Sequence, residues 1–148
     1  MPSLLHFLKL VLWMTAACVS ALPASVQAGE EDDARSAVEE IRTTISKQEF
    51  ELLWDSHLSE VFKGGVRKAD FLQNMRQGRA HVGLARAVTP MSYTFAEFDP
   101  TTGYRGKIYS FDFHVKYERG AFLERLVVVK DPDGRYRLAG IWANPAPQ

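Results

Sequence analysis

The chain has 148 residues, of which 46% are hydrophobic and 24% are charged, and these fractions are typical of a folded globular domain. They exclude a disordered or fibrous chain. Lysine and arginine together number 18, as do aspartate and glutamate, so the formal net charge is zero. No excess of positive charge points to nucleic acid, and we expect one domain without a nucleic-acid partner.

Residues 1–28 have the order of a cleavable secretory signal peptide. Lys9 supplies a positive charge, an apolar run follows at residues 10–19, and Val26 and Ala28 place small residues at the cleavage site. The alternative is a retained membrane anchor, but the run is shorter than the ~20 residues that span a bilayer. We expect cleavage after Ala28, a periplasmic or extracellular location, and no stable membrane span after cleavage.

The single cysteine, Cys18, lies inside this leader. Residues 15–18 loosely resemble a lipoprotein box, in which the cysteine is acylated and the protein stays anchored to the envelope. Thr15 stands where such a box has a branched apolar residue. If cleavage follows Ala28 instead, the mature domain has no cysteine and therefore neither a disulfide nor thiol chemistry.

The mature chain is predicted to form one domain, residues 29–144, followed by a disordered tail, residues 145–148. Apolar residues spaced three and four apart predict a helix over residues 34–45, after a frayed polar lead-in. The sequence Ser46-Lys47-Gln48-Glu49 has the pattern of a capping box and predicts a second helix up to Gly64. A third helix is predicted over residues 68–77.

After Ala87 the pattern changes to the alternation that is typical of strands. Strands are predicted over residues 91–96, 108–117, 122–130 and 136–143. Asp-Gly and Pro-containing turns separate them, among them Asp131-Pro132-Asp133-Gly134. Helices first and then four hairpin-linked strands predict an α+β fold in which the helices cover one face of an antiparallel sheet.

Three stretches resemble one exported bacterial family, known as domain of unknown function 4019: the Phe50–Trp54 pair, residues 79–86, and residues 133–142. Shorter matches are Gly106-Lys107-Ile108-Tyr109 and Glu124. The resemblance implies an envelope location and a helix-plus-sheet fold shaped like the cone of cystatin or of nuclear transport factor 2 (NTF2). It implies no known activity.

Asp112 and His114 alternate with apolar residues on one predicted strand and so share a face of the sheet. A neighbouring strand would bring Glu124 or Arg137 beside them. A carboxylate next to an imidazole is the minimum for proton transfer, because each group tunes the pKa of the other. The alternative is an ordinary solvated sheet face with cross-strand pairs.

Arg79, His81 and Arg86 flank Gly83 and form a candidate anion site, because guanidinium groups and free backbone amides both favour negative charge. The alternative is that they pair with surface carboxylates. A lone histidine, His57, is interpreted as a helix-boundary residue. Both Trp54 and Trp142 are expected to pack in the core.

The sequence contains no metal-binding motif and no cofactor motif, so we expect no metal and no cofactor. The leading hypothesis is a non-enzymatic accessory or binding module of the bacterial envelope, whose partner is an envelope protein or a small ligand. A second hypothesis is a small enzyme that uses Asp112 and His114 as an acid–base pair in a pocket. A third is an envelope component anchored by a lipid on Cys18.

Overall fold

The computed structural model describes residues 24–147, with side chains from Ala28 onward. Cys18 and most of the predicted signal peptide lie outside the described residues. Within them, helices come first and a four-stranded antiparallel sheet follows in the order β1-β2-β3-β4. This confirms the predicted α+β class. The elements are α1 (Ala24–Ser46), α2 (Phe50–Leu52), the π-helix η1 (Leu53–His57), α3 (Glu60–Lys63), α4 (Lys68–Val82), β1 (Ala85–Phe98), β2 (Arg105–Tyr117), β3 (Gly120–Lys130) and β4 (Tyr136–Pro145).

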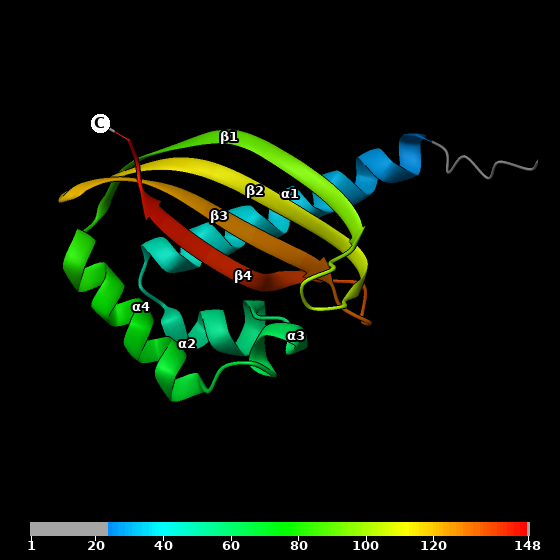
Figure 1. The fold of residues 1–148 in the computed structure, drawn as a ribbon, viewed down its shortest axis with the longest axis horizontal. Helices are drawn as coiled ribbons and strands as arrows, with labels where there is room; N and C mark the ends of the chain where they lie inside the picture. The colour runs from blue at the N-terminus through cyan, green and yellow to red at the C-terminus, as the bar shows by residue number, and fades with distance from the viewer. Residues whose placement is uncertain (1–23, 148) are drawn as a thin grey trace, which may run out of the picture.

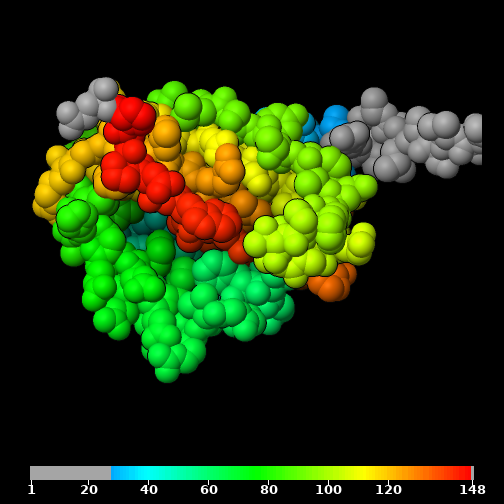
Figure 2. Space-filling view, viewed as in Figure 1, coloured from blue at the N-terminus to red at the C-terminus, as the bar shows by residue number. Residues whose placement is uncertain are grey.

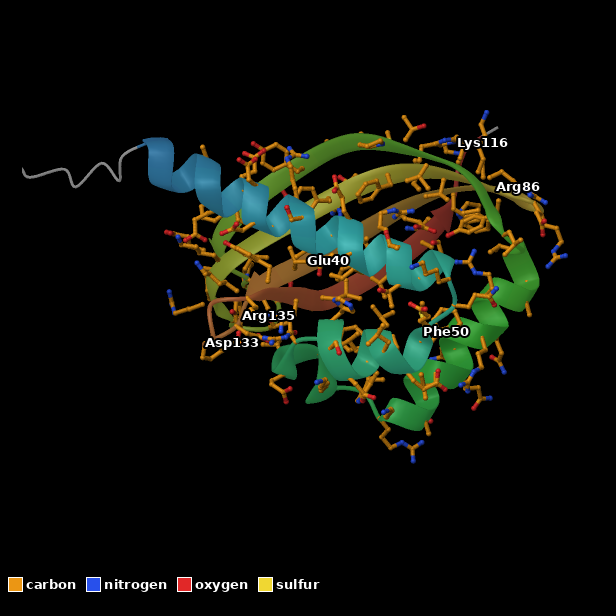
Figure 3. The ribbon with its side chains drawn as sticks, turned by 180° about the vertical axis from the view of Figure 1, so that it is seen from behind. Glu40, Phe50, Arg86, Lys116, Asp133 and Arg135 are labelled. Carbon is orange, nitrogen blue, oxygen red and sulfur yellow. The ribbon has the colours of Figure 1, made fainter. Side chains whose placement is uncertain are left out.

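One long helix, α1, lies across a face of the sheet, and the shorter helices lie on the side of β4 (Figures 1 and 3). The apolar stripe of α1 is Ala34, Val38 and Ile41, and all three side chains are buried. Alternate residues of the strands pack against this stripe. The buried strand residues are Tyr109, Phe111, Phe113 and Val115 of β2, Leu126 and Val128 of β3, and Tyr136 and Leu138 of β4.

The second helix departs from the prediction. The hydroxyl of Ser46 donates to the carbonyl of Thr43, so the capping box does not form, and Gln48 makes the turn with a φ of 61°. The expected single helix is divided into α2, η1 and α3. The reason is tertiary: Leu58 is extended, pairs with Leu138 at the edge of β4, and is fully buried.

Both halves of the fold extend further than the sequence patterns predict. Residues 29–33, expected to be frayed, are helical, and α4 continues through Gly78 to Val82. Strand β4 continues past the predicted strand end at Ala143 to Pro145, the first residue of the expected tail, because Pro145 lies opposite Phe122 on β3.

Glu30, in the extra length of α1, joins the helix to three strands. The ammonium groups of Lys107 on β2 and Lys130 on β3 each lie 2.8 Å from its Oε1, and the hydroxyl of Tyr136 on β4 donates to Oε2 at 2.6 Å. These partners, Lys107 first, lower the pKa of Glu30 to about 2. The first turns of α1 are therefore part of the folded domain.

Glu30→Gln is expected to destabilise the protein by about 1–2 kcal/mol at pH 7, a value discounted because the carboxylate is partly solvated. A pKa that is lowered in the folded state stabilises it above the unfolded value, and that contribution is lost as pH falls through the folded value. The difference between Glu30→Gln and the native protein should therefore shrink between about pH 5 and pH 2. Urea unfolding measures it, with the exposed Asp32→Asn as control; a difference that does not change with pH would contradict the assignment.

Candidate functional site

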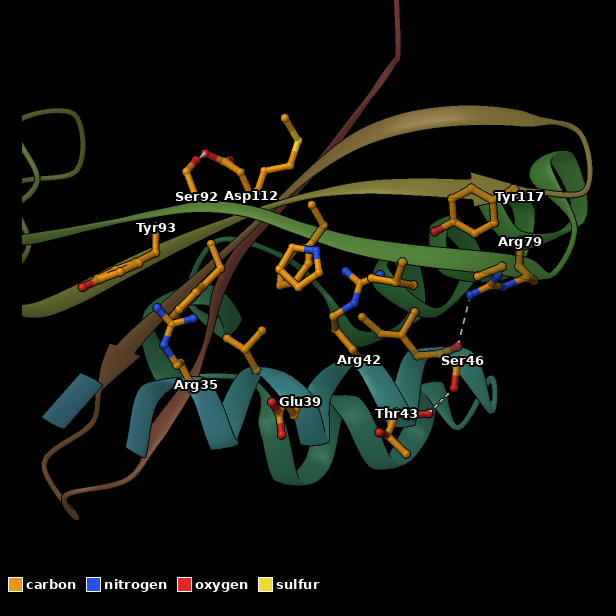
Figure 4. A pocket seen from close by; sticks show the side chains of 18 residues that line it. Arg35, Glu39, Arg42, Thr43, Ser46, Arg79, Ser92, Tyr93, Asp112 and Tyr117 are labelled. Carbon is orange, nitrogen blue, oxygen red and sulfur yellow. Dashed lines mark hydrogen bonds between the residues drawn. The ribbon is translucent and has the colours of Figure 1, made fainter. Parts of the chain in front are cut away.

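A cleft of about 570 Å³ lies between α1 and the inward faces of β1 and β2 (Figure 4). It exists because α1 covers β2, β3 and β4 but leaves the side chains of β1 exposed. On the strand side the lining is mainly apolar, with Val88, Pro90 and Tyr93, and it also includes Ser92 and Asp112. On the helix side it is polar, with Glu39, Thr43 and Ser46 among the lining residues. Its volume lies within the range of about 300–1,000 Å³ that is common for small-molecule pockets.

Three arginines line the cleft, and each lies over an aromatic ring. The guanidinium carbon of Arg35 lies 4.6 Å from the ring centre of Tyr93, that of Arg42 lies 4.3 Å from Phe113, and that of Arg79 lies 5.3 Å from Tyr117. Stacking on a ring holds a guanidinium flat and leaves its edge free for hydrogen bonds. The cleft therefore has a row of oriented positive groups beside an apolar wall.

The three arginines differ in their counter-charges. Arg35 is bonded to Glu31 at 2.8 Å, and Arg42 to Glu124 at 3.2 Å. Arg79 instead donates to two backbone carbonyls, those of Gly83 at 2.9 Å and Ile45 at 3.2 Å. Among the described residues no carboxylate makes an ion pair with Arg79. The positive charge at the Arg79 end of the cleft is therefore not neutralised by an ion pair, which makes this end the best place for an anionic ligand to bind.

Glu124 lies on the inward side of the sheet, so the prediction that it joins Asp112 and His114 is wrong. In the β2–β3 register it stands opposite Phe113, which fixes its side chain on the face toward α1. It accepts hydrogen bonds from Arg42 and from the hydroxyl of Tyr117. Burial, and then the bond to Glu124, raise the pKa of Tyr117.

Asp112 lies on the opposite, outward face, and its side chain points away from α1 (Figure 4). Arg125 donates to both of its oxygens, at 2.7 and 3.0 Å, and the hydroxyl of Ser92 donates at 3.0 Å. The bond from Arg125 lowers the pKa of Asp112. A carboxylate held in this way is a weak base. His114 shares this face and is half-buried, but among the described contacts it has no bond to Asp112. The structure thus gives the acid–base hypothesis no support.

The predicted anion site at residues 79–86 is occupied by the protein's own Glu118. The backbone N–H of Leu84 donates to it at 3.1 Å, and Arg86 pairs with it at the end of β1 next to α4 (Figure 3). The side chain of Arg79 enters the cleft instead, and His81 is exposed on the last turn of α4. The three candidates therefore do not form one site.

The remaining predictions have mixed outcomes. His57 ends η1, where burial lowers its pKa, and its Nε2 lies 3.5 Å from the hydroxyl of Thr44. Trp54 packs against Phe71 as expected, whereas Trp142 is 54% exposed, so the prediction that it lies in the core is wrong. Over residues 24–147 no helix is long and apolar enough to cross a membrane, and no three potential metal ligands gather.

Together these features define a small α+β domain with an open antiparallel sheet and a cleft beside its edge strand. Residues 37–141 match the family described as protein of unknown function (DUF4019), and the chain belongs to this family. The family membership predicted from the sequence is thus confirmed. No curated protein and no solved structure matches the chain, and the cone-like shape implied by the resemblance stays a prediction.

Arg35 and Arg42 were missed by the sequence reasoning. They stand seven residues apart beside the apolar stripe of α1, which places them on one side of the helix. Tyr93, Phe111 and Phe113 entered the predictions only as alternating residues of the strands 91–96 and 108–117. The sequence did contain a signal for these arginine–aromatic pairs. The arginines flank the apolar stripe of a helix, and the strands that pack on this helix are rich in aromatic residues.

Arg42→Met is expected to destabilise the protein by about 2–4 kcal/mol, because it leaves Glu124 buried without its positive partner. The double variant Arg42→Met/Glu124→Gln should recover part of this loss, since the amide keeps an acceptor for Tyr117 without a charge. Urea unfolding of both variants measures the coupling. An equal loss in the two would show that Glu124 does not need the guanidinium.

Proposed function

We propose that this protein is an exported, non-enzymatic binding module of the bacterial envelope, and that its cleft binds an amphipathic organic anion. The observation that carries the proposal is Arg79, a guanidinium at the cleft wall whose hydrogen-bond partners are two carbonyls. Carbonyl groups carry only partial negative charge, so the arginine keeps positive charge to offer a ligand.

The shape of the cleft supports a ligand with an apolar body. Val88 and Tyr93 are each about 40% exposed, at 43% and 40%, although they face α1. Covering such side chains is favourable, at roughly 25 cal/mol for each Å² of apolar surface removed from water. A ligand with an apolar body would cover the side chains of β1, and its anionic head group would at the same time bind Arg79.

The proposal predicts that decanoate, a ten-carbon carboxylate, binds more tightly than decyltrimethylammonium, which has the same chain with a positive head. Arg79→Gln should weaken decanoate binding by about tenfold or more, because a charge-assisted hydrogen bond is worth roughly 1.5–3 kcal/mol. Glutamine removes the charge but keeps a hydrogen-bond donor at this position, which limits damage to the fold. Isothermal titration calorimetry measures each affinity.

Arg86→Gln is the matched control, since Arg86 is an exposed arginine that pairs with Glu118 outside the cleft. It should bind decanoate as the native protein does. Equal binding of the anionic and cationic amphiphiles, or an unchanged affinity in Arg79→Gln, would refute the anion site. Thermal unfolding of each variant checks that the comparison is between folded proteins.

Export from the cytoplasm, after removal of the signal peptide, is part of the same proposal. Glu30, which joins α1 to three strands, comes two residues after the predicted cleavage point at Ala28. Cleavage there would leave every described side-chain contact of the domain in place, and Glu30 would stand in the first turn of α1, where the helix dipole favours a negative charge.

Mass spectrometry of the protein recovered from its native cell envelope should give a mature N-terminus at Gly29, without a lipid. A mass that includes residue 18 with an acyl group would favour the lipid-anchored alternative. A mass of the complete chain would contradict cleavage altogether.

A further inference from the structure

The outward face of the sheet carries a row of polar and aromatic side chains that the cleft does not use. Ser92, Asp112, Arg125 and Trp142 stand opposite one another on β1, β2, β3 and β4. The first three are joined by hydrogen bonds from the serine and the arginine to the aspartate. The next row toward the far end of β2 adds His114, Leu123 and Asn144.

Trp142, at the end of this row, is held against Gly140. A Cβ atom placed on Gly140 would lie 2.2 Å from Cη2 and 2.4 Å from Cζ3 of the indole, so the ring rests directly on the glycine backbone. The outer edge of the six-membered ring is held in this way, and the side chain as a whole is 54% exposed. The indole is therefore a positioned platform and not a free side chain.

A β-bulge gives Trp142 this orientation. The register of β3 and β4 shifts between Val127 and Val128, where β4 has an extra residue. Leu138 and Ile141 both pack toward the core, and the shift turns Gly140 and Trp142 outward. Bulges commonly re-aim a side chain near a functional site.

The platform borders a trough of about 870 Å³ on the outward face. Figure 2 shows it between β1, the loop after Phe98 and the C-terminal part of β4. Val127 and Leu123 form part of its apolar floor, and Asp112, Arg125 and Asn144 contribute polar groups. Further polar lining residues are Thr101 and Thr102 of the loop after Phe98 and Ser110 of β2. Such a mixed lining suits a ligand that has both C–H faces and hydroxyls.

We infer that this trough binds a saccharide built of pyranose rings, with one ring laid on Trp142. A pyranose has an apolar face of C–H groups and a rim of hydroxyls that donate and accept. The C–H face packs against an aromatic ring, and the hydroxyls form hydrogen bonds with planar carboxylate, guanidinium and amide groups. The charges of Asp112 and Arg125 cancel within their ion pair, and the other charged residues that line the trough, Asp99 and Glu124, are acidic. The trough therefore disfavours an anion, whereas the hydroxyls of a neutral polyol can donate to the carboxylates of Asp99 and Asp112.

The inference rests on other observations than the anion proposed for the cleft, because Trp142 lines the trough and Arg79 lines the cleft, although the two hollows share Met91, Ser92, Asp112 and Phe113 in their linings. It is tested on the whole protein with cellotriose and chitotriose, whose rings present flat C–H faces, and with mannitol, an open-chain polyol without such a face. Saturable binding of at least one trisaccharide, and none of mannitol, is expected in calorimetry and in tryptophan fluorescence.

Four variants make the result specific. Trp142→Ala should weaken trisaccharide binding by at least about tenfold, and Trp142→Tyr should retain most of it. Gly140→Ala keeps the indole but displaces it, and it should also weaken binding. Leu52→Ala removes an exposed leucine on α2, away from the trough, and should change nothing.

No binding of either trisaccharide at about 10 mM, or equal affinity in Trp142→Ala, would overturn the inference. So would binding that is lost equally in Trp142→Tyr and Trp142→Ala. If sedimentation shows instead that the native protein self-associates and Trp142→Ala does not, the platform is an interface between copies and the saccharide site is refuted.

Discussion

The fold depends on how much of the sheet α1 can cover, and the cleft arises because the helix is narrower than the sheet. A helix is about 10 Å across with its side chains. Four strands spaced by ~4.8 Å extend roughly 14 Å between the axes of the outer two. One helix therefore cannot cover the whole face. On the side of β4 the short helices complete the cover, and Leu58 pairs with the strand itself. On the side of β1 nothing among the described residues does so, and the uncovered strip becomes one wall of the cleft.

Arg79, at one end of the cleft, also provides hydrogen bonds to backbone carbonyls at two helix ends. The carbonyl groups at the end of a helix lack partners within it. Arg79 donates to the carbonyl of Ile45, near the end of α1, and to that of Gly83, just after α4. It thereby joins the two helix ends, while its ring partner Tyr117 fixes the plane of the guanidinium. A residue that stabilises the fold is in this way also presented to the cleft.

Sequence periodicity located the elements because it reports local burial. The stripe of α1, the strands and the Asp133-Gly134 turn, where the glycine has a φ of 84°, follow from neighbours a few residues apart. The division of the second helix did not follow, because it depends on Leu58 meeting β4, eighty residues later in the chain.

The sites were harder to predict, for a related reason. Strict alternation along β4 groups Trp142 with the buried Tyr136 and Leu138, and only the bulge reverses it. The face on which Glu124 lies depends on which residue of β2 it pairs with. This register between two strands cannot be read from the sequence of either strand alone. Both errors concern which face a residue occupies, and pairing between strands decides that.

The residues that carry the family resemblance act mainly in the fold. Gly83 has a φ of 80° and lies against Glu118, where a Cβ would clash. Arg137 donates a hydrogen bond to Asp133 and so stabilises the turn before β4. Gly140 supports the indole of Trp142. Positions of the matching stretches also reach the candidate sites: Trp142 lines the trough, and Arg79 lines the cleft. Strand β2 then connects the two surfaces, since Phe111 and Phe113 face the cleft while Asp112, between them, faces the trough. A shift of one residue in the register of β2 would exchange the two faces, so the pairing that holds β2 in place preserves both sites together.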